Sequence, residues 1–363
     1  MSEPVVPVTS TFTVTGHGYG HGHGMSQYGA RGAAIAGLTA SQILAFYYPG
    51  TATGTDSRRI RVQITGDTGH DVVVLPERGL KITDLGTGRT YALPAKGQKA
   101  WRIRVAYGHV RLAYLLGGWH RYKPGGRGYL VGNGQFSSST SALTLRTPSG
   151  DRRYRGYLRL DSGITVNVLA LDNYLKGVVP REMPALWQAA AVQAQAIAAR
   201  TYAARSMTDN NTRAAQVCDT SSCQVYGGLA AEQPASNAAV AATAGKILTY
   251  GGIPAFTQFG SSNGGWTSAG NAPYLPAKAD PYDATPSNPN STWTKTINRS
   301  AVRAAYPGHG ALTSIQVGAR DAAGKRVTQI LLTWSDGAVT KPSGDSFRSI
   351  FGLKSTYFSV SAP

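Results

Sequence analysis

The longest helical pattern in the chain reads Trp187-Gln-Ala-Ala-Ala-Val-Gln-Ala-Gln-Ala-Ile-Ala-Ala-Arg-Thr-Tyr-Ala-Ala-Arg-Ser-Met207. It contains neither Gly nor Pro and is dominated by Ala, the residue with the highest helix propensity. Val192, Ala196, Ala199 and Tyr202 recur at helical spacing and give this predicted helix a narrow face of mostly small side chains. Because small side chains let a neighbouring segment approach closely, we expect the helix to be central and buried.

Immediately before this helix the chain reads Val178-Val-Pro-Arg-Glu-Met-Pro184. A proline disfavours helix at the residue before it, so Pro180 and Pro184 predict a rigid, non-helical turn around Glu182. A general acid needs such fixed placement, and apolar neighbours such as Met183 would raise its pKa. The alternative is a carboxylate that stabilises the positive end of the helix dipole, and the spacing alone leaves both interpretations open.

Residues 57–150 have the alternating apolar and polar pattern of β-strands, interrupted by Gly-rich turns. The alternation is seen in three runs, Arg59–Ile64, Trp101–Val105 and Val110–Tyr114. Arg occupies the outward positions, with Ile and Val inward, which predicts a small all-β domain, a sandwich or a barrel. The predicted class is therefore α+β. A mixed core domain of residues 10–56 and 151–363 surrounds the Ala-rich helix, and residues 57–150 form an inserted domain.

The 363 residues include 36 Lys and Arg against 18 Asp and Glu, which gives a formal net charge of +18 at pH 7. A chain this basic should attract a polyanion, such as nucleic acid, an anionic membrane or an acidic cell wall. Only four of the acids are Glu, so Glu182 is conspicuous. No apolar run is long enough to cross a membrane, and the first residues lack the basic and apolar regions of a signal peptide.

The N-terminal part is dense in Gly and His and then becomes helical. Gly37 is expected to stop an Ala-rich helix, and Thr39 to cap a second helix over residues 40–47. The block Gly16–Gly24 carries three His, but Gly leaves metal ligands unpositioned and no carboxylate stands nearby. A closely packed loop and a loop that approaches a ligand both stay open.

Cys218 and Cys223 are the two cysteines of the chain. A zinc site would need two more ligands from elsewhere, so a local disulfide that pins the loop is favoured in an exported protein. Ser261 and Ser262 follow Gly260, but their spacing departs from the Gly-x-Ser-x-Gly pattern of a hydrolase nucleophile. We therefore expect turn chemistry at these serines.

Taken together, these segments resemble one family, the SpoIID/LytB family of stage II sporulation protein D and amidase-enhancer relatives. Four motifs and a weaker match at residues 347–355 carry the resemblance, and none of them falls in residues 57–150. The motifs are Gly20-His-Gly-His-Gly-Met-Ser-Gln-Tyr-Gly-Ala30 with Ile43–Thr51, Tyr174-Leu-Lys-Gly-Val-Val-Pro-Arg-Glu-Met-Pro184 with Ala194–Tyr202, Asp219–Gly227, and Ser261-Ser-Asn-Gly-Gly-Trp-Thr267.

The chain departs from the family pattern in two ways. In the sporulation protein the Gly-His-Gly-Met-Ser-Gln block comes late, whereas here it leads, so a shared fold would require residues 17–28 to return beside Glu182. Some relatives resemble zinc proteins with a His just upstream of the Cys pair, but Thr212, Gln216 and Val217 occupy that stretch here. We therefore expect no metal and no cofactor.

The resemblance implies a peptidoglycan lytic transglycosylase, located outside the cell or at its wall. Such an enzyme cuts the bond between N-acetylmuramic acid and N-acetylglucosamine in glycan strands, here expected to be free of stem peptides. Glu182 would act first as acid and then as base, which leaves 1,6-anhydro ends.

The same resemblance implies a set of substrate-binding residues, namely His21, His23, Ser26, Gln27, Arg200, Gln224, Tyr226, Ser261 and Ser262. Arg200 would hold either a substrate carboxylate or a loop, and loop packing or helix anchoring is the alternative for the others.

Two other classes of function stay open. The chain could be a non-catalytic module that binds wall glycan and enhances a cell-wall amidase. Its charge alone would also allow nucleic-acid binding, with an affinity that falls steeply with salt. No recognition motif accompanies that charge, so no nucleic-acid partner is expected.

Overall fold

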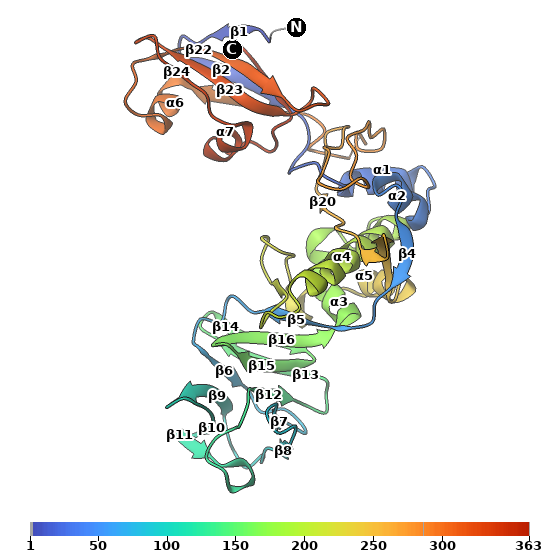
Figure 1. The fold of residues 1–363 in the computed structure, drawn as a ribbon, viewed down its shortest axis with the longest axis vertical. Coiled ribbons are helices and arrows are strands. Elements are labelled where there is room, and N and C mark those ends of the chain that lie inside the picture. Colours follow the sequence, from blue (N-terminus) through green and yellow to red (C-terminus); the bar gives the residue numbers. More distant parts are fainter. Residues whose placement is uncertain (1–2, 286, 363) are drawn as a thin grey trace. The chain divides into compact units, whose positions relative to one another are not determined.

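The computed structural model describes residues 3–285 and 287–362 and divides into two compact units (Figure 1). Unit 1 comprises Met1–Thr51 and Thr257–Pro363, and unit 2 comprises Ala52–Phe256. Each unit contains both helices and sheets, which confirms the α+β class. The units group the chain differently from the domains predicted above, since residues 57–150 and the Ala-rich helix share unit 2. The division at residues 57 and 150 stays a prediction.

The β-rich part of unit 2 consists of two sheets, and their strands contact each other. The first sheet contains β6 (Asp71–Val74), β9 (Ala100–Ala106), β10 (His109–Leu116), β11 (Gly118–Tyr122), β13 (Ala142–Thr147) and β14 (Gly150–Arg155), in the order β11-β10-β9-β6-β13-β14. The second contains β5 (Arg59–Gln63), β7 (Lys81–Asp84), β8 (Thr90–Ala92), β12 (Gly134–Ser137), β15 (Tyr157–Asp161), β16 (Ile164–Ala170) and β17 (Val217–Cys218), in the order β17-β5-β16-β15-β12-β7-β8.

The predicted alternation explains how these sheets form their core. In β5, Ile60 and Val62 are buried while Arg59 is exposed, so the apolar residues share one face. Strands β6 and β13 of the first sheet contact β15 of the second, and the apolar faces meet between them. Val105 departs from the inward placement expected for Val, because it lies near the end of β9 and is exposed.

The helices of unit 2 pack around α4 (Ala189–Asp209), the Ala-rich helix. Its neighbours are α3 (Leu171–Glu182), α5 (Pro234–Ala242) and β18 (Lys246–Tyr250), and β18 pairs with β4 (Ala52–Thr55) and β19 (Ile253–Pro254). The prediction of a central, buried helix is confirmed, because α4 is buried along most of its length. Ala side chains allow these three neighbours to approach on several faces.

Unit 1 contains helices near both ends of the chain. They are α1 (Gln27–Ile35), α2 (Ala40–Tyr47), α6 (Arg299–Ala305) and α7 (Gly344–Ile350). The Thr39 cap is confirmed, since its hydroxyl accepts from the Gln42 amide and the Gln42 side chain accepts from the Thr39 amide. Gly37 takes a φ of 88° after α1, as a residue that ends a helix commonly does.

The strands of unit 1 bring its two chain segments together. They are β1 (Val5–Pro7), β2 (Thr11–Gly16), β3 (Met25–Ser26), β20 (Phe259–Gly260), β21 (Trp293–Asn298), β22 (Leu312–Arg320), β23 (Val327–Trp334), β24 (Val339–Thr340) and β25 (Phe358–Ser361). They form the sheets β1-β22-β23-β24, β21-β2-β25 and β20-β3. Across the described residues, no helix combines the length and the apolar character needed to cross a membrane.

Candidate functional site

Glu182 is the last residue of α3, which corrects the prediction of a non-helical turn around it. Pro180 lies inside the helix, where it forfeits one backbone hydrogen bond. The helix tolerates this loss because Val178 and Val179 are fully buried and hold the last turn in place. Pro184 has the predicted effect, since the residue before it, Met183, is extended and the helix ends there.

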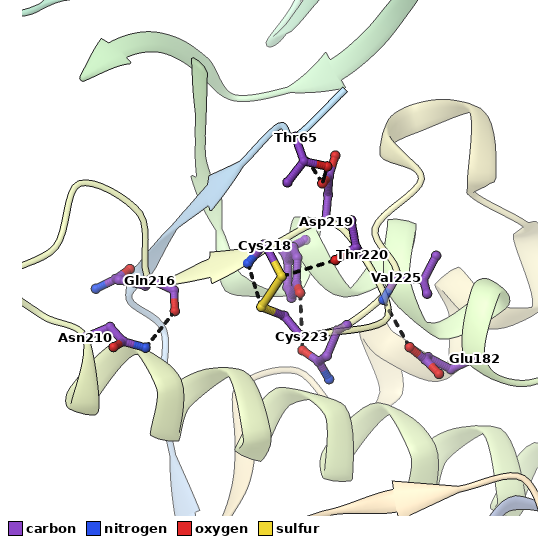
Figure 2. The surroundings of a disulfide bond; sticks show 11 residues. Thr65, Glu182, Asn210, Gln216, Cys218, Asp219, Thr220, Cys223 and Val225 are labelled. Atoms are coloured by element: carbon purple, nitrogen blue, oxygen red, sulfur yellow. Dashed lines mark hydrogen bonds between the residues drawn. A yellow bond between two sulfur atoms is a disulfide. The ribbon is translucent and has the colours of Figure 1, made fainter. Parts of the chain in front are cut away.

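The Glu182 carboxyl lies against the loop that follows β17 (Figure 2). Its Oε1 accepts a hydrogen bond from the Val225 amide at 3.2 Å. Burial raises the pKa of Glu182 above its usual range, although the Val225 amide and the Arg181 guanidinium lower it. A half-buried carboxyl with a raised pKa retains its proton to higher pH, which is what a proton donor needs.

A disulfide joins Cys218 and Cys223 at the start of this loop (Figure 2). The loop is fixed at two further points, because Asp219 accepts from the Thr65 hydroxyl at 2.6 Å and the Gly227 amide donates to the Gly177 carbonyl in α3. Residues 218–227 are therefore fixed on both sides of Val225. The position of the amide that faces Glu182 depends on this fixation.

Gln224 and Tyr226 belong to the same loop but point into the protein. The Gln224 amide donates to the Ala199 carbonyl of α4, and its oxygen accepts from the Tyr174 hydroxyl. The Tyr226 hydroxyl donates to Asn167 at 2.9 Å. Both side chains are buried, so their geometry fits the loop-packing alternative and not substrate contact.

Tyr202 is a neighbour of Glu182 that the sequence pattern placed only on a helix face. Its ring is half-buried, and burial together with the Glu182 charge raises the pKa of its hydroxyl. Burial and the charges of Tyr226 and Glu182 likewise raise the pKa of Tyr174 well above its usual value. Two phenols of α3 and α4 are thus close enough to sense the Glu182 carboxyl.

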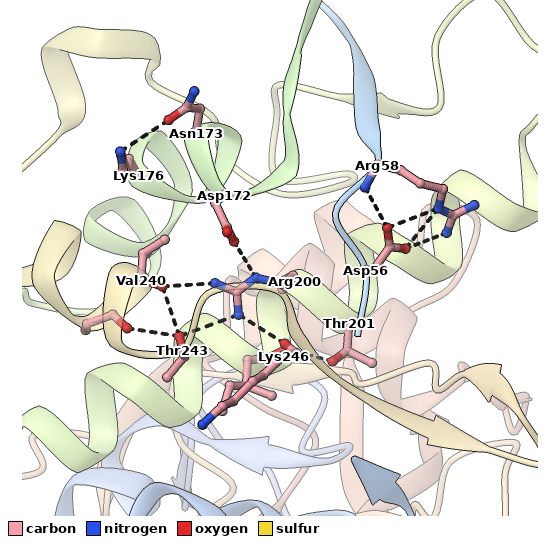
Figure 3. A network of polar contacts seen from close by, with 12 residues as sticks. Asp56, Arg58, Asp172, Asn173, Lys176, Arg200, Thr201, Val240, Thr243 and Lys246 are labelled. Atoms are coloured by element: carbon pink, nitrogen blue, oxygen red, sulfur yellow. Dashed lines mark hydrogen bonds and ion pairs between the residues drawn. The ribbon is translucent and has the colours of Figure 1, made fainter. Parts of the chain in front are cut away.

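Arg200 is completely buried and is held by internal partners (Figure 3). Its Nε donates to Asp172 at 2.7 Å, and its other nitrogens donate to the Lys246 and Val240 carbonyls. Burial lowers the pKa of Arg200, and the Asp172 carboxylate opposes this effect. Of the two roles left open above, this geometry fits the holding of a loop, because no face of the guanidinium reaches solvent.

In unit 1, the first and fourth motifs meet at a buried carboxylate. β3 pairs in parallel with β20, and the hydroxyls of Ser26 and Ser262 both donate to Asp283. Ser26 also caps α1 by accepting from the Gly29 amide. These contacts occupy both hydroxyls, and the two side chains are buried. Their geometry fits the close-packed alternative.

A second buried carboxylate, Asp280, extends this network. It accepts from the Tyr47 hydroxyl at 2.7 Å and from the Asn263 amide at 2.6 Å. Burial raises the pKa of Asp280, while these two donors lower it. Neither Asp280 nor Asp283 belongs to the residues that the sequence patterns singled out. The scarcity of acids in the chain was the available signal, since both lie within four residues of each other.

The remaining predicted residues also lie in unit 1. Gln27 is buried in the first turn of α1, and Ser261 is half-buried, with its carbonyl accepting from the Tyr28 amide. His21 and His23 are stacked, with ring centroids 5.1 Å apart, and line a cavity. The predicted residues are therefore distributed over the two units, with Glu182, its loop and Arg200 in unit 2 and the Gly-His block with its partners in unit 1.

No cluster of three or more His, Cys, Asp or Glu side chains suited to a metal ion occurs within residues 3–285 and 287–362. The loop beside Glu182 is instead held by the disulfide and by hydrogen bonds.

Comparison with known proteins places the Glu182 region in a family. Residues 161–250 match the SpoIID model, described as stage II sporulation protein. The chain is 44% identical over 131 residues to the amidase enhancer of Bacillus subtilis, a match that covers 34% of this chain and 17% of that protein. It is 34% identical over 154 residues to stage II sporulation protein D of the same organism, a match that covers 37% of this chain and 44% of that protein.

A third match, to stage II sporulation protein D of Bacillus amyloliquefaciens, is 36% identical over 143 residues and covers 34% of this chain and 42% of that protein. The chain thus spans less than half the length of these curated relatives. The matched model covers β16, α3, α4, the disulfide loop, α5 and β18, which are the elements that position Glu182. Residues 161–250 of this chain are therefore similar to the SpoIID/LytB family.

Proposed function

We propose that this chain acts on the bacterial cell wall as a peptidoglycan lytic transglycosylase. The observation that carries the proposal is the Glu182 carboxyl, which is half-buried, has a raised pKa and is fixed by the Val225 amide. It lies inside the segment that matches the SpoIID family. The substrate would be the bond between N-acetylmuramic acid and N-acetylglucosamine in glycan strands without stem peptides.

The proposed reaction needs one carboxyl. Protonated Glu182 donates its proton to the glycosidic oxygen as the bond from that oxygen to the anomeric carbon breaks. The resulting carboxylate then accepts the proton of the muramic 6-hydroxyl while the 6-oxygen bonds to the anomeric carbon. Because the attacking hydroxyl belongs to the sugar, no second carboxylate is needed to activate water. The charged side chain that acts on Glu182 is Arg181, a cation, which fits this single-acid arrangement.

Product analysis tests this proposal. The full chain is incubated with glycan strands stripped of stem peptides, and the products are examined by mass spectrometry. We expect 1,6-anhydro-muramyl ends that disappear with Glu182→Gln, a variant that retains an oxygen to accept from Val225. Hydrolytic ends, which carry one added water, would contradict the proposed chemistry.

A second candidate is a non-catalytic module that binds wall glycan and enhances an amidase. The 44% identity to a protein named amidase enhancer favours it. This candidate predicts glycan binding without cleavage, and faster release of stem peptides when the chain is added to a cell-wall amidase. Stimulation that persists in Glu182→Gln would favour the module over the enzyme.

Either role places the chain outside the cell or at its wall. The disulfide between Cys218 and Cys223 supports this location, because such bonds persist in oxidising compartments. Alkylation of the protein taken directly from its native source should leave both cysteines unlabelled until a reductant is added.

A further inference from the structure

A cavity of about 320 Å³ lies within unit 1, and none of the residues assigned above to the Glu182 group lines it. This volume is within the range of small-ligand sites. The polar groups that line it include His21, His23, Asp321, Arg326 and Asp345. Four alanines, at positions 269, 277, 322 and 323, also line the cavity. The cavity therefore combines charged groups with small apolar surfaces.

Arg326 is the unusual member of this lining, because it is a buried cation without an acidic partner. Its side chain is 5% exposed, and within the described part of the chain no carboxylate lies at ion-pair distance from it. Nη1 donates to the Gly20 carbonyl at 3.1 Å and Nη2 to the Asn263 carbonyl at 3.4 Å. Its Nε is buried with no hydrogen-bond partner.

An unpaired buried cation is costly, since its desolvation is not offset by a counter-charge. Burial lowers the pKa of Arg326 to about 10, so the group stays charged at neutral pH. Asp321 and Asp345 attract it from a distance, while Arg348 repels it. An anion in the cavity that Arg326 lines would offset this cost.

The Gly-His block closely surrounds this guanidinium. A Cβ on Gly22 would lie 2.1 Å from Nη2 of Arg326, and Gly22 has a φ of +77° that favours glycine. His21 lines the same cavity, where its Nδ1 accepts from the His23 amide at 2.9 Å and its ring is also hydrogen-bonded to the Phe259 backbone. Although His21 is exposed on one side, desolvation together with its neighbours His23, Arg326 and Arg348 lowers its pKa to about 4, against the opposing hydrogen bond with the Phe259 backbone.

We propose that this cavity binds a carboxylate on a methyl-bearing carbon, with Arg326 as its charged partner. Two wall groups share this chemistry, the lactyl group of muramic acid and the terminal alanine of a stem peptide, and this choice of ligand rests on the proposed function. The alanine methyls suit the methyl group. Asp321 and Asp345 would repel a second negative charge, so the site favours a monoanion over a phosphate dianion.

Calorimetric titration of the full chain with defined probes tests the site. N-acetylmuramic acid carries the lactyl carboxylate, D-alanyl-D-alanine carries the peptide terminus, and N-acetylglucosamine is the same sugar without the lactyl group. We expect one or both carboxylates to bind and N-acetylglucosamine not to bind. The probe that binds more tightly shows whether the natural ligand is the lactyl group of muramic acid or the terminal alanine of a stem peptide. Equal binding of N-acetylglucosamine, tighter binding of inorganic phosphate, or no binding of either carboxylate would overturn the proposal.

A matched pair of variants tests the role of Arg326. Arg326→Gln should weaken carboxylate binding at least tenfold, whereas Arg303→Gln, which removes an exposed charge from the same unit, should leave it unchanged. Unchanged binding in Arg326→Gln would contradict the assignment. The measurement is repeated in Glu182→Gln, where retained binding without cleavage separates this site from the proposed reaction.

A second readout needs no substitution at Arg326. The ring of His21 is titrated by NMR with and without the bound carboxylate. A nearby anion stabilises the imidazolium, so the pKa of His21 should rise from about 4 by one unit or more. If the probe binds and this pKa does not move, the ligand is elsewhere and the proposal fails.

Discussion

Two buried arginines of this molecule have opposite surroundings. Arg200 in unit 2 is fully buried and donates to the Asp172 carboxylate at 2.7 Å and to two carbonyls. Arg326 in unit 1 is almost as buried, yet the groups that accept its hydrogen bonds are uncharged, and its Nε has no hydrogen-bond partner. The first holds α4 to its neighbours, and the second faces a cavity.

The acidic residues of unit 2 show the same contrast. Glu232 is paired with Arg155, whose guanidinium donates to both of its carboxyl oxygens. Glu182 has one backbone donor, and burial raises its pKa. A buried charge whose partners are all internal serves the fold, whereas a buried group left with an open partner position is available to a ligand.

The largest expected effect is on cleavage. Glu182→Gln should lower the yield of anhydro-muramyl ends by about 10²–10⁴-fold, because the proton donor is lost. Glu232→Gln should keep the yield while lowering the free energy of unfolding, since Arg155 loses its charged partner. Mass spectrometry and urea unfolding of both variants make the comparison. Similar losses of cleavage in the two variants would contradict the different roles assigned to Glu182 and Glu232.

Substitution of the two arginines should change the free energy of unfolding by different amounts. Arg200→Met should lower the free energy of unfolding by about 2–4 kcal/mol, because two carbonyls lose their buried donor while the partly exposed Asp172 can be solvated. Arg326→Met should change it by about 1 kcal/mol or less, since removing an unpaired charge offsets the lost hydrogen bonds. Both values come from urea unfolding at pH 7. An Arg326 variant as unstable as the Arg200 variant would show that both residues are structural.

Loss of the disulfide should change both the free energy of unfolding and the pKa of Glu182. Replacing Cys218 and Cys223 by Ser should cost about 2 kcal/mol of unfolding free energy in the chain-entropy model for so short a loop. It should also loosen the Val225 amide. Because the hydrogen bond from that amide lowers the pKa of Glu182, the pKa should rise when the bond weakens. The pH above which cleavage declines should therefore rise. An unchanged pH profile would show that the loop keeps its position without the disulfide.

The smallest expected effect is the pH dependence of stability. The pKa of Glu182 is raised on folding, so the folded state binds the proton more tightly than the unfolded state. The stability of the wild type therefore falls as pH rises through the interval between the two pKa values. Glu182→Gln should be slightly more stable than the wild type at pH 7, with the difference vanishing below about pH 4. A difference independent of pH would indicate that Glu182 has an unshifted pKa.

Local patterns predicted several elements closely. The Thr39 cap and the helix it begins follow from one capping residue and its partner three positions later, and the structure has both. The Ala-rich helix is shifted by two residues at each end, as expected where boundaries depend on caps. Glu182 was singled out because Glu is rare in the chain and lies in a recognisable motif.

Burial explains one wrong prediction and bears on several alternatives that the sequence left open. Pro180 was expected to break a helix, but burial of Val178 and Val179 compensates for the missing hydrogen bond. Gln224, Tyr226, Ser26 and Ser262 lie in recognisable motifs, yet their polar groups bond inward. A motif indicates that a residue is important, but it does not indicate whether the side chain contacts a ligand or another part of the protein. The burial of a side chain depends on segments distant in sequence.

The amino-acid sequence by itself determined the α+β class, the basic character and the family motifs, and it singled out Glu182. Propensity, periodicity and motif spacing are local properties, and they act on a few neighbouring residues at a time. The tertiary structure decided which charges are paired. Asp172 meets Arg200, and Asp283 meets Ser26 and Ser262, only because distant segments pack together. Arg326 looks ordinary in the sequence, and folding alone places it, unpaired, at a cavity.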